Sequence, residues 1–265
     1  MIERTGFSKV GYLLLFTFMC GAIPYHAAGF QSQNEVDQLI NEAVEYFEQG
    51  NETRATQLYE RVLDIEPENG EALWNHSVLL TQRGFRLKDQ TDPMPFYETA
   101  MESADKCLEH HPQMAGCHFA KALVTGRIAK RSNARERLRM SKEIKQYIDK
   151  ALELDPEFAK TWHLLGVWHT EAANLSGVER FAANALFGGA PEGASNEKAI
   201  KSFNKALELE PENILTHLDF ARLYIEIGEE EKAIELLEKL LTLKPVYEDD
   251  ERNKKIARDL LNELK

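Results

Sequence analysis

A helix that ends at a proline recurs along the chain, and this repeat constrains the fold more than any other feature. Four segments share the pattern: RATQLYERVLDIEPEN, EIKQYIDKALELDPEF, KAIKSFNKALELEPEN and KAIELLEKLLTLKPVY; TAMESADKCLEHHPQM is a weaker copy. Proline cannot continue the helical hydrogen-bond ladder, so each one marks a helix end. The five prolines are Pro67, Pro112, Pro156, Pro211 and Pro245. The last interval, of 34 residues, equals the tetratricopeptide period, and the longer ones predict insertions within repeats.

The spacing of small and large residues predicts how the helices of a repeat pack. In the last repeat, Ala221 and Ala233 allow close approach, while Tyr224 and Leu237 fill the space beside them. We therefore predict an all-α, tetratricopeptide-repeat-like right-handed α-solenoid with inserted loops over residues 30–265. Its repeats are predicted at 36–69, 70–114, 115–158, 159–213 and 214–247. Residues 249–265 are predicted to form a capping helix, because terminal repeats need a polar outer face.

The first 29 residues differ from the rest. Arg4 and Lys9 precede an apolar run over residues 10–23, and small residues follow at Ala28 and Gly29. This pattern predicts a signal peptide over 1–29, cleaved after Ala28 or Gly29, and hence a periplasmic or secreted protein. The alternative is an uncleaved anchor, although the run is shorter than the roughly 20 residues that a spanning helix needs. Membrane contact is expected only through this segment, if it is uncleaved.

No motif in the chain indicates catalysis or cofactor binding. G-x-G-x-x-G, Walker, H-E-x-x-H and G-x-S-x-G sequences are all absent. His163 and His169 lie six residues apart and do not share a helix face, and the eight histidines form no four-ligand pattern. The net charge of −12 disfavours nucleic acid as a partner. We therefore predict a binding protein that is not an enzyme and needs no metal or cofactor.

One basic stretch and one cysteine pair stand out. The stretch has a local charge of +6 and predicts either a docking patch for an acidic partner or lipid head groups, or a solvated helix face. Its basic residues are Arg127, Lys130, Arg131, Arg135, Arg137, Arg139, Lys142 and Lys145. Cys107 and Cys117 lie equally far from Pro112, so a helical hairpin would bring them face to face. An export compartment would permit a disulfide; two small buried residues are the alternative.

We hypothesise an apolar binding groove on the concave side, from the positions that face the inner curve of tetratricopeptide repeats. The predicted groove residues are Ile40, Val44, Phe47, Leu79, Phe119, Leu123, His163, Val167, Leu215, Leu218, Arg222 and Ile225. Something should cover such a surface. The candidates are an apolar ligand, an amphipathic partner helix, or the chain's own loops and C-terminal helix. Within the insertion we expect Phe181, Leu186 and Phe187 to pack back on the solenoid as an ordered flap.

The insertion also carries a family resemblance. The run WHLLGVWHTEAANLSGVERFAANALFGGAPEGASNEKAIKSFNKALELEPEN is similar to the signature region of the regulator of microtubule dynamics family. Leu175-Ser176 and Ala185-Leu186-Phe187 match its pattern, and Ala190-Pro191 stands where two prolines are expected. The resemblance covers roughly residues 36–260. It implies a tetratricopeptide-like domain with partner or microtubule association and no catalytic motif. We interpret the chain as a bacterial-looking exported member.

Two functions remain open on the sequence. The first is a scaffold that holds a protein or peptide partner in its groove. The second is a carrier of an apolar small molecule or lipid, with the 175–191 loop over the groove.

Overall fold

The computed structural model describes residues 25–87, 91–175, 177–186, 189 and 193–265. Within these ranges the chain is built of helices joined by short turns, with no strand. The predicted signal peptide falls largely on residues 1–24, outside the described part, and α1 runs through the predicted cleavage position at Ala28 and Gly29. No helix of the described part combines the length and the apolar composition needed to cross a bilayer.

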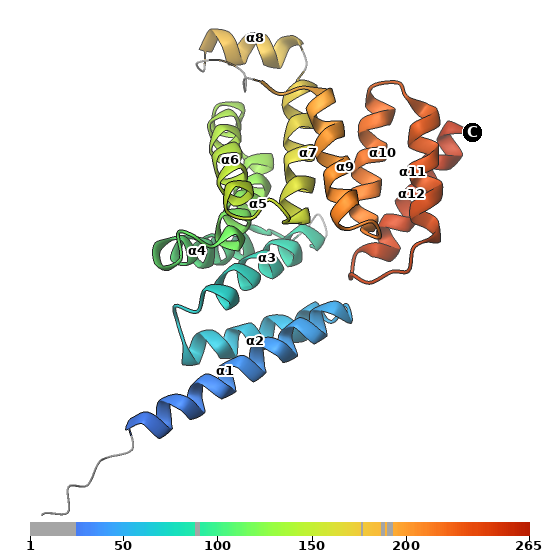
Figure 1. The fold of residues 1–265 in the computed structure, drawn as a ribbon. Helices are drawn as coiled ribbons and strands as arrows, with labels where there is room; N and C mark the ends of the chain where they lie inside the picture. Colours follow the sequence, from blue (N-terminus) through green and yellow to red (C-terminus); the bar gives the residue numbers. More distant parts are fainter. Residues whose placement is uncertain (1–24, 88–90, 176, 187–188, 190–192) are drawn as a thin grey trace, which may run out of the picture.

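The helices pack mainly as antiparallel pairs that follow one another along the chain (Figure 1). The pairs are α1 (Tyr25–Glu48) with α2 (Glu52–Ile65), α3 (Gly70–Arg86) with α4 (Met94–His110), α5 (Ala115–Arg131) with α6 (Ala134–Leu154), α7 (Ala159–Ala173) with α9 (Asn196–Leu209), and α10 (Ile214–Glu226) with α11 (Glu230–Thr242). The last helix, α12 (Asp250–Leu264), packs against α11 and α10. Successive pairs contact each other mostly through the second helix of one pair and the first helix of the next, so each pair packs on its neighbours as in a solenoid.

The sequence Glu-Pro-Glu-Asn occurs at two pair junctions and forms the same local structure at both. Asn69 caps α3 by accepting from the backbone N–H of Ala72 at 3.0 Å, and its amide donates to Glu66 at 3.0 Å. Asn213 caps α10 in the same way, with Glu210 in the role of Glu66. Because such a cap satisfies a backbone donor that the helix leaves open, the proline and asparagine together set where one helix ends and the next begins.

Small residues at the helix crossings let the pairs pack closely. A Cβ placed on Gly166 would lie 2.8 Å from the Phe203 ring, and one on Gly116 would lie 2.8 Å from the Trp74 ring. Ala221 and Ala233 are fully buried where α10 meets α11. The alanine and glycine positions of the repeat therefore serve packing, as the sequence pattern predicted.

The insertion between α7 and α9 forms α8 (Gly177–Leu186), which stands apart from the other helices at one end of the molecule (Figure 1). The Phe181 side chain is 74% exposed, so the expectation that it packs back on the solenoid is wrong. Figure 1 shows α8 beyond the ends of α7 and α9. The side chains of Leu186 and Phe187 lie outside the described residues.

Candidate binding surface

The loop between α11 and α12 contacts Phe47, Gly50 and Arg86, which precede it by more than 150 residues. Arg86, at the end of α3, holds this contact. Its Nε donates to Asp249 Oδ2 at 2.6 Å and its Nη1 donates to Glu248 Oε2 at 3.1 Å. The same guanidinium donates twice to Glu52 of α2, at 2.8 Å each. One arginine therefore joins α2, α3 and the loop, and we call residues 246–249 the closure segment.

Aromatic and backbone contacts also hold the closure segment against the first helix pair. The Tyr247 ring lies 5.4 Å from the Phe47 ring at the end of α1. The Val246 carbonyl oxygen approaches the turn after α1 so closely that a Cβ on Gly50 would lie 2.7 Å from it. Gly50 also has φ +74°, a left-handed conformation that favours glycine. Asp250 fixes the backbone of the segment, because its carboxylate accepts hydrogen bonds from the backbone N–H groups of Val246 and Tyr247.

The charges around the closure segment shift several pKa values. Burial by itself lowers the pKa of Arg86, but the hydrogen bonds and charges of Glu52 and Asp249 outweigh it and raise this pKa above its ordinary range. Burial, followed by nearby carboxylates such as Glu210, raises the pKa of Tyr247 to about 12. Arg86 and Tyr247 thus keep their ordinary protonation states at neutral pH.

Four further cations lie on aromatic rings. The guanidinium of Arg127 is 3.8 Å from the centroid of the Phe85 ring, and that of Arg252 is 5.4 Å from the same ring. Arg83 lies over Phe96 at 5.1 Å and Lys160 over Phe47 at 5.0 Å. Within the described part of the chain, Arg83, Arg127 and Lys160 form no ion pair with a carboxylate.

Burial lowers the pKa of Arg127 and of Lys160 from their ordinary values. Arginine stays protonated in proteins, so Arg127 keeps its charge at neutral pH. Arg127 is therefore a partly desolvated positive charge, on which the carboxylates of Asp219, Glu171 and Asp249 act only from a distance. Partly desolvated cations of this kind favour a negatively charged group beside them.

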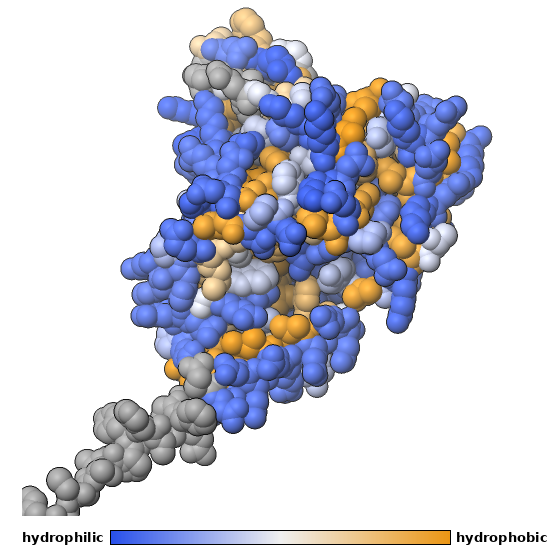
Figure 2. All heavy atoms as spheres, viewed as in Figure 1, coloured by the Kyte–Doolittle hydropathy of each residue, from blue (hydrophilic) through white to orange (hydrophobic). Residues whose placement is uncertain are grey.

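The predicted groove residues do not form one open apolar surface. Leu79, Phe119 and Leu218 are at most 5% exposed and belong to the core, so their place in an open groove is wrong. Phe119 packs on Phe158 with ring centroids 5.1 Å apart, and Leu218 packs with residues of α11 and α12. Leu79 packs with residues of α1 and α2, so each of the three side chains lies inside a hydrophobic cluster. Figure 2 shows apolar residues in narrow strips between hydrophilic ones on the face in view.

The other predicted groove residues keep some exposure. Ile40, Phe47, Leu123, His163, Val167 and Ile225 are partly buried, whereas Val44, Leu215 and Arg222 are exposed. Only Phe47 contacts the closure segment through an aromatic pair that the structure shows. Sequence reasoning missed Arg86, Phe85 and Lys160, because their roles depend on segments that are distant in sequence. A role of the predicted groove residues in binding a ligand stays a prediction.

His163 belongs to a polar cluster between α7 and α10. Its Nδ1 lies 2.9 Å from Thr216 Oγ1, and its Nε2 lies 3.3 Å from Asp219 Oδ2. Arg222 donates to the other carboxylate oxygen of Asp219 at 2.9 Å. Burial would raise the pKa of Asp219, but His163 and Arg222 outweigh it and lower this pKa. Thr216 is buried and its hydroxyl donates to Asn213, so this hydroxyl accepts from His163 and does not donate to it.

The basic stretch is divided between different environments. Arg127 faces Phe85, as described above, while several of the others pair with acidic neighbours. Lys130 pairs with Glu171 at 2.7 Å, Arg131 with Asp92 at 3.8 Å, Lys145 with Asp149 at 2.6 Å, and Arg139 with Glu136 and Glu143. These pairs neutralise part of the local charge. A docking role for the whole stretch, including Arg135, Arg137 and Lys142, stays a prediction.

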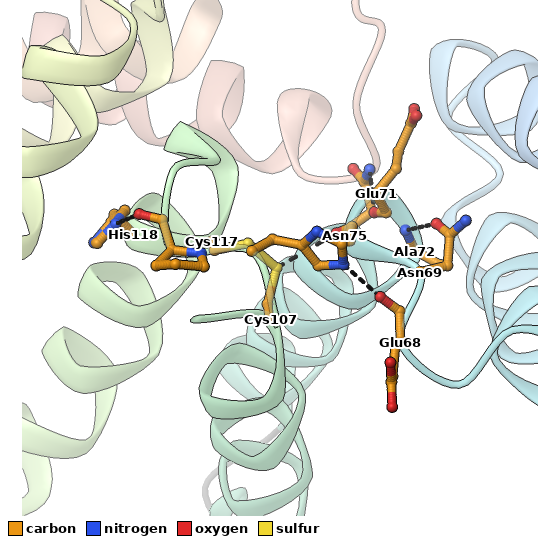
Figure 3. The surroundings of a disulfide bond; sticks show 11 residues. Glu68, Asn69, Glu71, Ala72, Asn75, Cys107, Cys117 and His118 are labelled. Carbon is orange, nitrogen blue, oxygen red and sulfur yellow. Dashed lines mark hydrogen bonds between the residues drawn. A yellow bond between two sulfur atoms is a disulfide. The ribbon is translucent and has the colours of Figure 1, made fainter. Parts of the chain in front are cut away.

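Cys107 and Cys117 form a disulfide between α4 and α5 (Figure 3). Their Cα atoms are 5.4 Å apart and both side chains are fully buried. Figure 3 places the bridge close to the start of α3, where Asn69 and Ala72 lie. The hairpin geometry expected from the equal spacing about Pro112 thus brings the two sulfur atoms together. Elsewhere, the described residues contain no group of three or more His, Cys, Asp and Glu that could hold a metal ion.

Comparisons with known proteins place the chain in a family. A family model described as Regulator of microtubule dynamics protein 1-3 matches residues 35–265. Regulator of microtubule dynamics protein 3 of Bos taurus is 27% identical over 238 residues, covering 88% of this chain and 50% of the cow protein. Regulator of microtubule dynamics protein 1 of Mus musculus is 26% identical over 209 residues, covering 77% of this chain and 66% of the mouse protein. The chain thus spans about half of the cow protein's length.

A solved structure supports the fold. TTC0263, a thermophilic TPR protein of Thermus thermophilus, aligns with a TM-score of 0.61 at 19% identity, covering 84% of this chain and 98% of that protein. The predicted all-α, tetratricopeptide-like solenoid is therefore confirmed.

The relatives named above are vertebrate proteins, so they do not support the interpretation of the chain as bacterial-looking and exported. The family match itself extends over most of the chain, through α12 to the last residue. The chain belongs to the Regulator of microtubule dynamics protein 1-3 family.

Proposed function

We propose that this chain is a non-catalytic scaffold that binds a protein or peptide partner. The observation that carries the proposal is the closure segment, a non-helical stretch held by side chains of α1 and α3. A surface that binds a stretch of its own chain through an aromatic pair and an arginine has the chemistry to bind a peptide from elsewhere. Helical-repeat solenoids present extended surfaces of this kind to partners. The names of the relatives make a partner connected with microtubule dynamics a candidate.

The alternative, a carrier of an apolar molecule or lipid, needs a cover over an apolar surface. The 175–191 loop was the predicted cover, and the exposed Phe181 argues against that arrangement. The burial of Leu79, Phe119 and Leu218 removes part of the apolar groove as well. The structure therefore favours the scaffold over the carrier.

Native mass spectrometry of the chain purified from its natural host distinguishes the two functions. A scaffold is expected to retain a polypeptide of defined mass, which disappears when salt is raised because charged contacts weaken. Retention of a small apolar molecule that survives high salt, with no polypeptide, would contradict the scaffold. A sample purified after expression in an unrelated host is the control, since it lacks the natural partner.

Export through residues 1–29 remains part of the proposal. It rests on the basic start, the apolar run and the small residues at Ala28 and Gly29. Determination of the N-terminal residue of the natural protein tests it. Cleavage after Ala28 or Gly29 would support export, whereas an N-terminus at Met1 would leave an anchor or no processing.

A further inference from the structure

The closure segment makes a contact that a solenoid does not require. Repeats in solenoids normally contact only their neighbours, and stability follows from these local interfaces. Here the loop before α12 contacts α1, the turn after it and α3, although α12 already packs on α11 and α10. The side chains that make this contact are an aromatic ring, Tyr247, and two carboxylates, Glu248 and Asp249.

The receiving surface consists of Phe47, Gly50, Phe85, Arg86 and Arg127. Phe47 takes the tyrosine ring, and the absence of a side chain at Gly50 lets the segment's backbone approach. Arg86 takes the two carboxylates. Each part of the closure segment thus meets a group of matching chemistry on a surface formed by distant residues.

Some of the positive charge at the receiving surface forms no ion pair with the closure segment. The charge of Asp249 acts on Arg127 from a distance, without an ion pair between them. Arg127 and Arg252 both lie over the Phe85 ring. Arg252 pairs with Asp249 at 3.9 Å, whereas Arg127 forms no ion pair within the described residues. Lys160 adds a further cation over Phe47, with Glu210 and Glu52 acting on it only from a distance.

The three cations without an ion pair, Arg83, Arg127 and Lys160, come from α3, α5 and α7 and lie on three different rings. The closure segment itself shows that a peptide with an aromatic ring and two carboxylates fits this surface. The arrangement therefore favours an acidic peptide over one compact anion.

We infer that the receiving surface is a docking site for a short partner segment with an aromatic side chain beside two or more carboxylates, and that the closure segment occupies it in the absence of that partner. The inference rests on the proposed scaffold function and specifies its partner. A tethered segment competes at a high effective concentration. The partner overcomes this advantage by pairing with Arg127 and Lys160, which the closure segment leaves unpaired.

Peptide binding to the full chain tests the inference. The probe is a fluorescent peptide with the sequence of residues 245–250, Pro-Val-Tyr-Glu-Asp-Asp. The chain variant Glu248→Gln/Asp249→Asn weakens the internal competitor and leaves Arg86 paired with Glu52. By fluorescence anisotropy, this variant is expected to bind the probe at least about tenfold more tightly than the unmodified chain, as charged hydrogen bonds to the competitor are lost.

Two controls separate docking from general charge attraction. A probe with glutamine and asparagines in place of its acids should bind at least about tenfold more weakly. Adding Arg127→Gln to the variant should weaken binding of the acidic probe, whereas Lys201→Gln, which removes an exposed cation of α9, should not. Circular dichroism of each variant checks that the helices are intact.

Equal binding by the variant and the unmodified chain, or equal binding of the acidic and amide probes, would overturn the inference. So would displacement of the probe by inorganic phosphate or by anionic lipid vesicles at lower concentrations than by unlabelled peptide. If the natural partner is still retained by a chain carrying Arg127→Gln and Tyr247→Ala, the scaffold function stands but its site lies elsewhere.

Discussion

Replacement of Arg86 by methionine tests the junction between the two ends of the solenoid. Methionine keeps much of the aliphatic volume and removes the charge. The substitution leaves the carboxylate of Glu52, which is 4% exposed, without its ion-pair partner. Removing one member of a buried pair costs about 3–5 kcal/mol, mainly because the remaining charge is desolvated. Asp249 and the half-exposed Glu248 can turn toward water, so they add little.

We therefore expect Arg86→Met to lower the free energy of unfolding by about 3 kcal/mol, at the lower end of that range. Urea denaturation followed by circular dichroism measures this change. The double variant Arg86→Met/Glu52→Gln should recover at least about half of the loss, because it removes the stranded charge. Arg54→Met, which disrupts an exposed pair with Glu42, should change stability by less than about 0.5 kcal/mol.

A loss no larger than that of Arg54→Met would refute the reasoning, since it would show that the Glu52 carboxylate is hydrated or finds another donor. An equal loss in the single and double variants would locate the cost in packing instead of charge.

Three other perturbations have expected outcomes. Gly166→Ala should destabilise the fold by about 1–3 kcal/mol in urea denaturation, because the new methyl group meets a phenylalanine ring, while Gly126→Ala, with its nearest neighbour at 3.9 Å, should be neutral or slightly stabilising; equal effects would contradict the packing argument. Reduction of the Cys107–Cys117 bridge should lower stability by about 2–3 kcal/mol, and alkylation without reductant should find neither thiol free. Burial, followed by neighbouring lysines, lowers the pKa of His169 to about 4 in the folded chain. Below pH 6.5 the unfolded chain therefore binds a proton that the folded chain does not, and the free energy of unfolding should fall by up to about 3 kcal/mol between pH 6.5 and 4. Replacement of His169 by glutamine should reduce this pH dependence.

The helix boundaries were predictable because they depend on short-range chemistry. The proline that ends a helix and the asparagine that starts the next lie within a few residues of each other, as at Pro67 and Asn69. Packing positions were predictable for the same reason, since Ala221 and Ala233 follow the period of the repeat. The cysteine pair could be proposed because both residues flank one turn.

The surface was less predictable because it depends on how repeats are rotated relative to one another. The positions of Phe119 and Leu218 within their repeats predicted an inner surface, yet neighbouring helices bury both. For Phe181 the error is the opposite, since its apolar character predicted burial and the side chain is 74% exposed.

The sequence by itself determined the repeat, the helix ends, the small residues at the crossings and the family, because each is written in residues close together along the chain. Only the tertiary structure decided that Arg86 meets Glu248 and Asp249, that Tyr247 meets Phe47, and that Arg127 remains without an ion pair among the described residues. These contacts join segments that lie far apart in sequence. Their existence depends on the accumulated rotation of successive helix pairs, and no local pattern of residues records that sum.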